Sequence, residues 1–373
     1  MKILKPVCTK KNSLQIVTLI LVLILTGCSW RKISETQIPV KKTRNIILFI
    51  GDGMGLAHLN ASIDVSNRTF FLERFPYSGF SKTYSYDNYI TDSAAGGTAI
   101  ACGIKTRNGM IGMRPDSTII SSIVEIAHKH NLATGVVCTS AVTDATPASF
   151  VAHYSSRYNY EDIAKDFLRG TLDVFIGGGE DHFRRRQDGA DLTNTLKERG
   201  FSVAYSIDDL RKSPGQLAGL LAKQDMPLAS EGRAGMLEEM TKKAIEILSR
   251  DKDGFFLMVE SSMIDGGGHA NDIKYVVSEV IDMDKTIGVA KKFADQNGET
   301  LIVVTADHET GGLTITGGNL KSKHLEVKFS TSDHTAVMVP IFSYGPGAER
   351  FSGIHDNTFF LDEFLDLLKI KSK

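Results

Sequence analysis

Six short runs of consecutive apolar or β-branched residues constrain the fold of this chain more than any other feature. Runs without polar alternation are typical of strands buried on both faces of a parallel sheet. Three segments with helical periodicity lie between them, at Ser117–His130, Met236–Ser249 and Tyr275–Asp295. The alternation predicts an α/β fold: a doubly wound, mostly parallel sheet with helices on both faces. The six runs are Ile46–Ile50, Thr134–Cys138, Val174–Ile176, Phe255–Val259, Leu301–Thr305 and Val339–Tyr344.

The N-terminus has the pattern of an export signal. Four lysines precede a short apolar run, Ile16–Leu25, which is too short to span a bilayer comfortably. The run ends in Leu25-Thr26-Gly27-Cys28, which resembles a bacterial lipobox, so Cys28 is the predicted lipidation site. The alternative is an ordinary signal peptide with an incidental cysteine.

The resulting domain plan has three parts. Residues 1–27 are the predicted signal peptide, and residues 28–43 are a lipidated N-terminus with a polar tether. Residues 44–373 form a single predicted domain, in which the polar, irregular stretch 180–234 is a candidate surface insertion. We expect an exported protein, periplasmic or on the cell surface, that is bound to a bacterial membrane through its lipid.

Charge and cysteine content narrow the function classes. The chain has 43 Lys+Arg against 44 Asp+Glu, a net charge of −1, and no basic run, so nucleic-acid binding is not expected. Removing the signal lysines would leave a mature chain at −5. Only Cys102 and Cys138 would remain as unmodified cysteines; one disulfide or two buried free thiols both fit their apolar surroundings.

Polar side chains follow three of the predicted strands. Ligands of an open α/β sheet bind beyond the carboxyl ends of its strands. Asp52 follows the first run within Gly51-Asp52-Gly53-Met54-Gly55; this segment lacks the third glycine of a dinucleotide site, and an Asp there would repel a pyrophosphate. A metal ion held by Asp52 fits better than a plain glycine turn. Glu260, Asp265 and His269 follow the fourth run, and Asp307 and His308 follow the fifth.

The spacing of these groups suggests how they would hold metal. Gly266-Gly267-Gly268 separates Asp265 from His269, and three glycines disfavour a regular helix, so we expect a loop wrapped around one ion. Zinc takes such nitrogen and carboxylate ligands. His334, within Asp333-His334-Thr335, is a further candidate ligand. Each His-Asp pair taken alone is more often a surface hydrogen bond.

A serine and an arginine complete the candidate site. Ser93, in Thr91-Asp92-Ser93-Ala94-Ala95, is predicted to start a helix, where free N–H groups stabilise an anion. A simple helix cap is the alternative. No nucleophile elbow surrounds Ser93, so activation would come from a metal. Arg157, near Asp144-Ala145-Thr146-Pro147, is able to grip a phosphate, or else forms a surface salt bridge.

These ordered motifs resemble the alkaline phosphatase family, from about Arg44 to near the C-terminus. The motifs that carry the resemblance are Asn45–Gly55, Thr91–Ala95, Asp144–Pro147 with Arg157, Val259-Glu260, Ile264-Asp265 with His269, Thr305–His308 and Asp333–Thr335. The resemblance implies an alkaline-phosphatase-like fold. It also implies hydrolysis of phosphate monoesters through a phosphoserine on Ser93, at a centre of two Zn²⁺ and one Mg²⁺.

The family's ligand sets carry over residue by residue. The resemblance implies one zinc at Asp265, His269 and His334, and a second at Asp52, Asp307 and His308 with Ser93. It implies magnesium at Asp52, Thr146 and Glu260, with Asp144 reaching it through water, and Arg157 on the phosphate oxygens. The resemblance leaves open whether the protein forms a homodimer.

Two departures from the family and two alternative functions remain. Gly266 stands where the family usually has a large side chain, and the stretch from His308 to His334 is short. Gly266 therefore offers no positive charge to the bound phosphate. The alternative reason for a glycine here is a backbone conformation with positive φ. A phosphodiesterase of the same superfamily is the alternative enzyme, but such relatives commonly use a threonine nucleophile and lack the third metal and the arginine. The non-enzymatic alternative is a lipoprotein that scavenges phosphate or metal.

Overall fold

The computed structural model describes residues 42–371, and a ten-stranded sheet runs through them. The predictions for residues 1–27 and for Cys28 lie outside the described residues. In spatial order the strands are β14 (Gly353–Asp356), β2 (Tyr77–Lys82), β13 (Val339–Tyr344), β8 (Thr300–Thr305), β1 (Asn45–Gly51), β7 (Phe255–Ser261), β3 (Ala133–Ala141), β4 (Val174–Gly178), β6 (Leu217–Leu220) and β5 (Ser202–Ala204).

The sheet is mostly parallel, as predicted. The central strands β8, β1, β7 and β3 pair in parallel, and their register aligns Thr305, Ile50, Glu260 and Cys138 across the sheet. One predicted strand differs: β13 runs antiparallel to both of its neighbours, β2 and β8. Its apolar run therefore reports burial on both faces and not direction.

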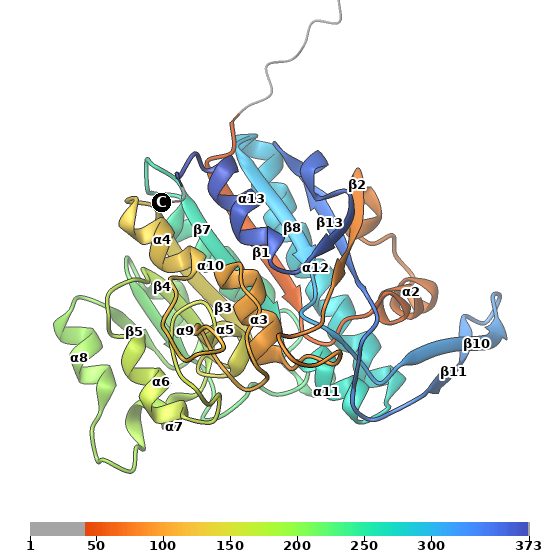
Figure 1. Ribbon diagram of the computed structural model, residues 1–373, viewed down its shortest axis with the longest axis horizontal. Coiled ribbons are helices and arrows are strands. Elements are labelled where there is room, and N and C mark those ends of the chain that lie inside the picture. Colours follow the sequence, from red (N-terminus) through yellow and green to blue (C-terminus); the bar gives the residue numbers. More distant parts are fainter. Residues whose placement is uncertain (1–41, 372–373) are drawn as a thin grey trace, which may run out of the picture. The chain divides into compact units, whose positions relative to one another are not determined.

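Alternate residues of the central strands face two hydrophobic layers. Helices cover both faces of the sheet, which makes the fold doubly wound (Figure 1). Ile46 and Leu48 of β1 face one layer, with α3 (Ser93–Cys102), α4 (Ile123–Lys129), α6 (Tyr160–Asp166) and α13 (Phe359–Leu367). Ile47 and Phe49 face the other, with α2 (Leu56–Val65), α10 (Met236–Leu248) and α12 (Ile273–Asn297). Strand side chains alternate between faces, so β1 is apolar throughout.

The stretch 180–234, the candidate surface insertion, contains α7 (Glu180–Arg184), α8 (Leu192–Glu198), β5, α9 (Ile207–Lys212) and β6. Every residue of β6 is buried, and this strand pairs with β4 and β5 at one edge of the sheet. Between His308 and His334, the short stretch forms β9 (Glu309–Thr310) and a hairpin of β10 (Leu313–Asn319) and β11 (His324–Phe329), followed by β12 (His334–Thr335).

Two further findings bear on the sequence predictions. Cys102 and Cys138 are both free and buried, so no disulfide joins them. Among the described residues, no helix has both the length and the apolar character that crossing a bilayer requires.

Candidate active site

The candidate site lies where the four central strands end. Asp52 directly follows β1, Glu260 is the penultimate residue of β7, and Asp307 and His308 follow β8. Asp144 and Thr146 follow β3, at the start of the short helix α5 (Ala145–Ala148). Because β8, β1, β7 and β3 are neighbours in register, their carboxyl ends bring these side chains to one edge of the sheet.

Asp265, His308 and His334 form the first group that is able to hold a metal ion. His334 Nε2 lies 3.6 Å from Asp265 Oδ1, and the His308 and His334 rings stack with centroids 3.6 Å apart. His269 Nε2 lies 3.1 Å from Asp265 Oδ2. Asp265 thus has a histidine against each of its carboxylate oxygens.

The segment carrying Asp265 and His269 is a helix and not the predicted loop. Helix α11 (Met263–His269) places the two residues four positions apart, and therefore on the same face. Packing explains why three glycines are helical here: an added Cβ on Gly267 would meet Val276 at 2.8 Å, and one on Gly268 would meet Thr310 at 2.8 Å. Tertiary contact with α12 and β9 overrides the weak helix propensity of glycine.

Asp52, Asp307 and His308 form the second group that is able to hold a metal ion. His308 Nε2 lies 3.5 Å from Asp52 Oδ1 and 3.2 Å from Asp307 Oδ2. Ser93 Oγ also lies 3.2 Å from His308 Nε2. Helix α3 begins at Ser93, as predicted, and Asp92 caps it by accepting a hydrogen bond from the Ala95 N–H.

A third cluster contains Glu260, Thr146 and Asp144. Glu260 is fully buried and accepts hydrogen bonds on Oε2 from Ser262, at 2.7 Å, and from Ser140, at 3.4 Å. Its other oxygen, Oε1, has no hydrogen-bond partner, and the same is true of the buried Thr146 hydroxyl. These oxygens form the donor set that magnesium prefers.

The pKa values of the buried carboxyls in this cluster indicate a site that favours bound cations. Burial, and then the charges of Asp307, Asp265, Glu260 and Asp144, raise the pKa of Asp52 well above its usual value. Burial likewise raises the pKa of Glu260, and it raises that of Asp307 to about 6. Asp52 Oδ1 and Asp307 Oδ2 are buried without a hydrogen-bond partner. Buried carboxylates at this density need cations, so the residues fit bound divalent metals.

Arg157 supplies a cation at the mouth of the site. Its guanidinium lies 3.3 Å from Asp92 Oδ2 and 3.5 Å from Asp144 Oδ1. It therefore pairs with carboxylates beside Ser93 and beside Thr146, and its Nε has no hydrogen-bond partner. The fork geometry of arginine suits two oxygens of a phosphate.

Sequence reasoning missed two residues of the site. Asp92, which entered the sequence analysis only as part of the motif around Ser93, caps α3, accepts a hydrogen bond from the Gly109 N–H and pairs with Arg157. Thr310 donates a hydrogen bond to Asp265 Oδ1, and its hydroxyl lies 3.3 Å from His308 Nδ1. A neutral threonine two positions after a histidine carries no signal by itself; only the fold shows its partners.

A family model for alkaline phosphatase matches residues 43–325. The chain belongs to the alkaline phosphatase family. Alkaline phosphatase 4 of Bacillus subtilis is 30% identical to it, with 91% of each chain covered. The solved alkaline phosphatase of the Antarctic bacterium TAB5 is 41% identical, with a TM-score of 0.85, and the match covers 89% of this chain and all of that one.

Membership confirms the fold and the enzyme class that the motifs predicted. This alkaline phosphatase is a metal-binding hydrolase of phosphate monoesters. A variant of the TAB5 enzyme, 40% identical to this chain over 89% of it, is described with Mg bound in a site called M3.

Proposed function

We propose that this alkaline phosphatase cleaves phosphate monoesters with Ser93 as the nucleophile, at a centre of two Zn²⁺ and one Mg²⁺. One zinc would be held by Asp265, His269 and His334. The second would be held by Asp52, Asp307 and His308, next to Ser93. Magnesium would be held by Asp52, Thr146 and Glu260, with Asp144 nearby. When bound, the metals lower the pKa of the serine hydroxyl and neutralise the leaving oxygen.

The observation that carries the proposal is the 3.2 Å separation of Ser93 Oγ and His308 Nε2 at the start of α3. The serine oxygen faces the histidine of the second metal group, and it lies at the N-terminus of a helix, whose dipole stabilises a bound anion. A threonine nucleophile, common in the phosphodiesterase relatives, is absent from this position.

The chain's residues then have separate tasks. Arg157 holds two phosphate oxygens, and Asp92 and Asp144 hold Arg157 in place. The Ser93 oxygen attacks phosphorus and forms a new O–P bond. The ester P–O bond breaks at the same time, and the leaving oxygen takes up a proton. A water molecule then attacks the phosphoserine and releases inorganic phosphate, which regenerates the hydroxyl.

Activity on p-nitrophenyl phosphate and on its bis ester, with and without chelator, tests the reaction type. We expect turnover of the monoester, little of the diester, and loss of both with chelator. Preference for the diester would indicate a phosphodiesterase. Phosphate binding without turnover of either ester would indicate a scavenging protein.

The third metal is tested separately. Adding magnesium to zinc-loaded enzyme should raise its activity, because Glu260, Thr146 and Asp144 offer only oxygen ligands. Glu260→Ala should abolish that response and lower the bound magnesium measured by elemental analysis. Full activity with two metals, indifferent to magnesium, would contradict the third site.

We also propose that the enzyme is exported and anchored through lipid on Cys28, next to Leu25-Thr26-Gly27. Cys28→Ser should shift the protein out of the membrane fraction or block its processing. Unchanged processing and membrane retention in this variant would refute the anchor.

A further inference from the structure

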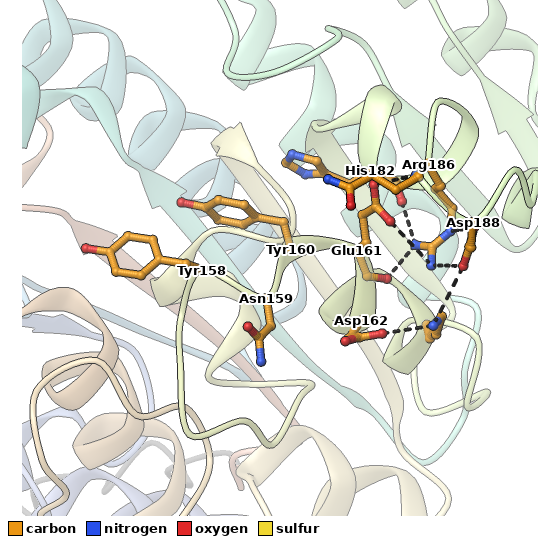
Figure 2. A pocket seen from close by; sticks show the side chains of 10 residues that line it. Tyr158, Asn159, Tyr160, Glu161, Asp162, His182, Arg186 and Asp188 are labelled. Atoms are coloured by element: carbon orange, nitrogen blue, oxygen red, sulfur yellow. Dashed lines mark hydrogen bonds and ion pairs between the residues drawn. The ribbon is translucent and has the colours of Figure 1, made fainter.

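A cleft of about 570 Å³ is lined by residues that begin directly after Arg157, and none of its lining residues takes part in the reaction described above. Two segments line it, 158–165, which directly follows Arg157, and 182–188, at the end of α7 (Figure 2). We propose that this cleft is a subsite for the leaving group of the ester, and that it selects leaving groups with a flat ring, such as a nucleoside. The inference rests on the proposed function.

Both walls of the cleft are tied to the phosphate-binding residues. On one wall, Tyr158 follows Arg157, whose guanidinium pairs with Asp144. On the other, His182 Nδ1 lies 2.6 Å from the Thr143 hydroxyl, and Thr143 precedes Asp144 in the chain. Burial raises the pKa of Tyr160, and the charge of Asp144 adds to the rise. An ester whose phosphate lies against Arg157 thus has the cleft within reach of its organic half.

Aromatic rings form the inner side of the cleft. The rings of Tyr160 and His182 stack with centroids 4.9 Å apart and an interplanar angle of 6°. Tyr158 meets Tyr160 edge-on at 6.4 Å, and 72% of Tyr158 is exposed. A large exposed aromatic beside a stacked pair offers a face for a flat ring, as in the stacking platforms of nucleotide-binding proteins.

Charged side chains line the opposite side of the cleft and pair with one another (Figure 2). Arg186 is buried and its donors bind Asp188 and the carbonyls of Glu161 and His182. Lys165 pairs with Asp162 at 2.8 Å and with Asp188 at 3.8 Å. Both cations that line the cleft therefore have carboxylate partners. Burial lowers the pKa of His182, so its ring is uncharged at neutral pH.

The chemistry of the lining defines the ligand class. Three carboxylates, Glu161, Asp162 and Asp188, accept hydrogen bonds and repel further phosphate groups. A leaving group that presents a ring to Tyr158 and amino or hydroxyl donors to the carboxylates fits this surface. Adenosine meets both requirements, whereas a short alkyl group meets neither.

The test compares kcat/KM for adenosine 5′-monophosphate with kcat/KM for ethyl phosphate, on the full-length metal-loaded enzyme. Stacking on an aromatic side chain is worth enough that removing it should lower the ratio of the two values by roughly five-fold or more. We expect that fall in Tyr158→Ala and not in Tyr158→Phe, which keeps the ring. The matched control is Tyr77→Ala, because Tyr77 is an exposed tyrosine of β2 near the other edge of the sheet.

An unchanged ratio in Tyr158→Ala would overturn the subsite while leaving the proposed function intact. A fall of equal size in Tyr77→Ala would overturn it too, since the effect would not belong to the cleft. A wild-type enzyme that hydrolyses neither ester would refute the proposed function, and the subsite with it.

Discussion

The side-chain oxygen of Thr310 lies 3.3 Å from Nδ1 of His308. Because the Thr310 hydroxyl donates its proton to Asp265, it is able only to accept from His308, so the proton of this imidazole lies on Nδ1. The lone pair of Nε2 then points toward Asp52, Asp307 and Ser93. One hydroxyl thereby orients a ligand of each candidate zinc site.

Thr310→Val should therefore weaken metal binding without changing the volume of the side chain much. Loss of such an orienting hydrogen bond typically costs 10- to 100-fold in metal affinity, so we expect a fall of about that size. Competition with a chromogenic chelator measures it directly. Thr310→Ser keeps the hydroxyl and should retain most of the affinity; equal losses in both variants would show that packing, not the hydrogen bond, matters.

Ser93→Ala should remove turnover while leaving the metal ligands in place. Because the nucleophile acts as a unit with the rest of the site, we expect kcat to fall by roughly three orders of magnitude or more. No phosphoserine should be trapped by acid quenching with labelled phosphate, although wild type should give one. Near-normal activity in Ser93→Ala would mean that water attacks phosphorus directly.

In the metal-free enzyme, the buried carboxyl of Asp307 should stabilise the fold less as pH rises. Burial, together with the charge of Asp265, raises the pKa of Asp307 to about 6, above its value near 4 in an unfolded chain. A carboxyl that binds its proton more tightly in the folded state stabilises the fold less and less as pH rises from about 4 through about 6. The raised pKa values of Asp52 and Glu260 act in the same direction.

Asp307→Asn isolates this effect. With chelator present, the stability advantage of the variant over wild type should grow from about pH 4 to about pH 6 and level off above that, on the order of 2 kcal/mol, measured by urea unfolding. With zinc present, the order should reverse, because the variant lacks a ligand. The control is Asp253→Asn at an exposed site. A difference between Asp307→Asn and wild type that is independent of pH would contradict the prediction.

Gly266 has no space for a larger side chain, because Tyr275 packs against it. It has no positive φ, so backbone conformation does not require glycine there. A Cβ on Gly266 would lie 2.6 Å from the Tyr275 hydroxyl oxygen. Gly266→Ala should therefore lower the free energy of unfolding by about 1–3 kcal/mol. Adding Tyr275→Phe, which removes the clashing atom, should restore much of the loss; no recovery in thermal unfolding would place the clash elsewhere.

The Tyr275→Phe variant, which lacks the clashing hydroxyl, also allows the effect of a positive charge at position 266 to be tested. Gly266→Lys with Tyr275→Phe should tighten inhibition by inorganic phosphate roughly five-fold, the worth of an exposed or water-mediated charge contact. The comparison is with Gly266→Ala in the same background. Equal phosphate inhibition constants would refute a role for charge at this position.

Much of the fold was predictable because its strands are apolar on both faces. The runs that became β1, β3, β7 and β8 carry the centre of the sheet, and α10 and α12 begin and end within two residues of their predicted bounds. The edge strand β14 and its neighbour β2 were not predicted, since both keep exposed residues and lack a continuous apolar run. The antiparallel direction of β13 was not predicted, because an apolar run indicates burial on both faces and not the direction of the strand.

The site was less accessible to sequence reasoning. Charged ligands at strand ends are visible because residue type and position both point to metal. The partners of Thr310 are not: Asp265 is 45 residues away in the chain, and a hydroxyl indicates nothing until the fold supplies its neighbours. The helix at Gly266–Gly268 was missed because its stability comes from contact with α12 and β9.

The alignment of four central strands has a consequence for how the enzyme comes into being. Its candidate metal ligands extend from Asp52 to His334 in the sequence, and none of the clusters is built from one contiguous segment. A polypeptide that has been synthesised and folded only as far as α11 contains Asp52 and Asp265 but neither Asp307 nor His308. On the proposed ligand assignment, the second metal group is complete only after β8 has paired with β1, so a chain folded only as far as α11 would not yet hydrolyse phosphate esters.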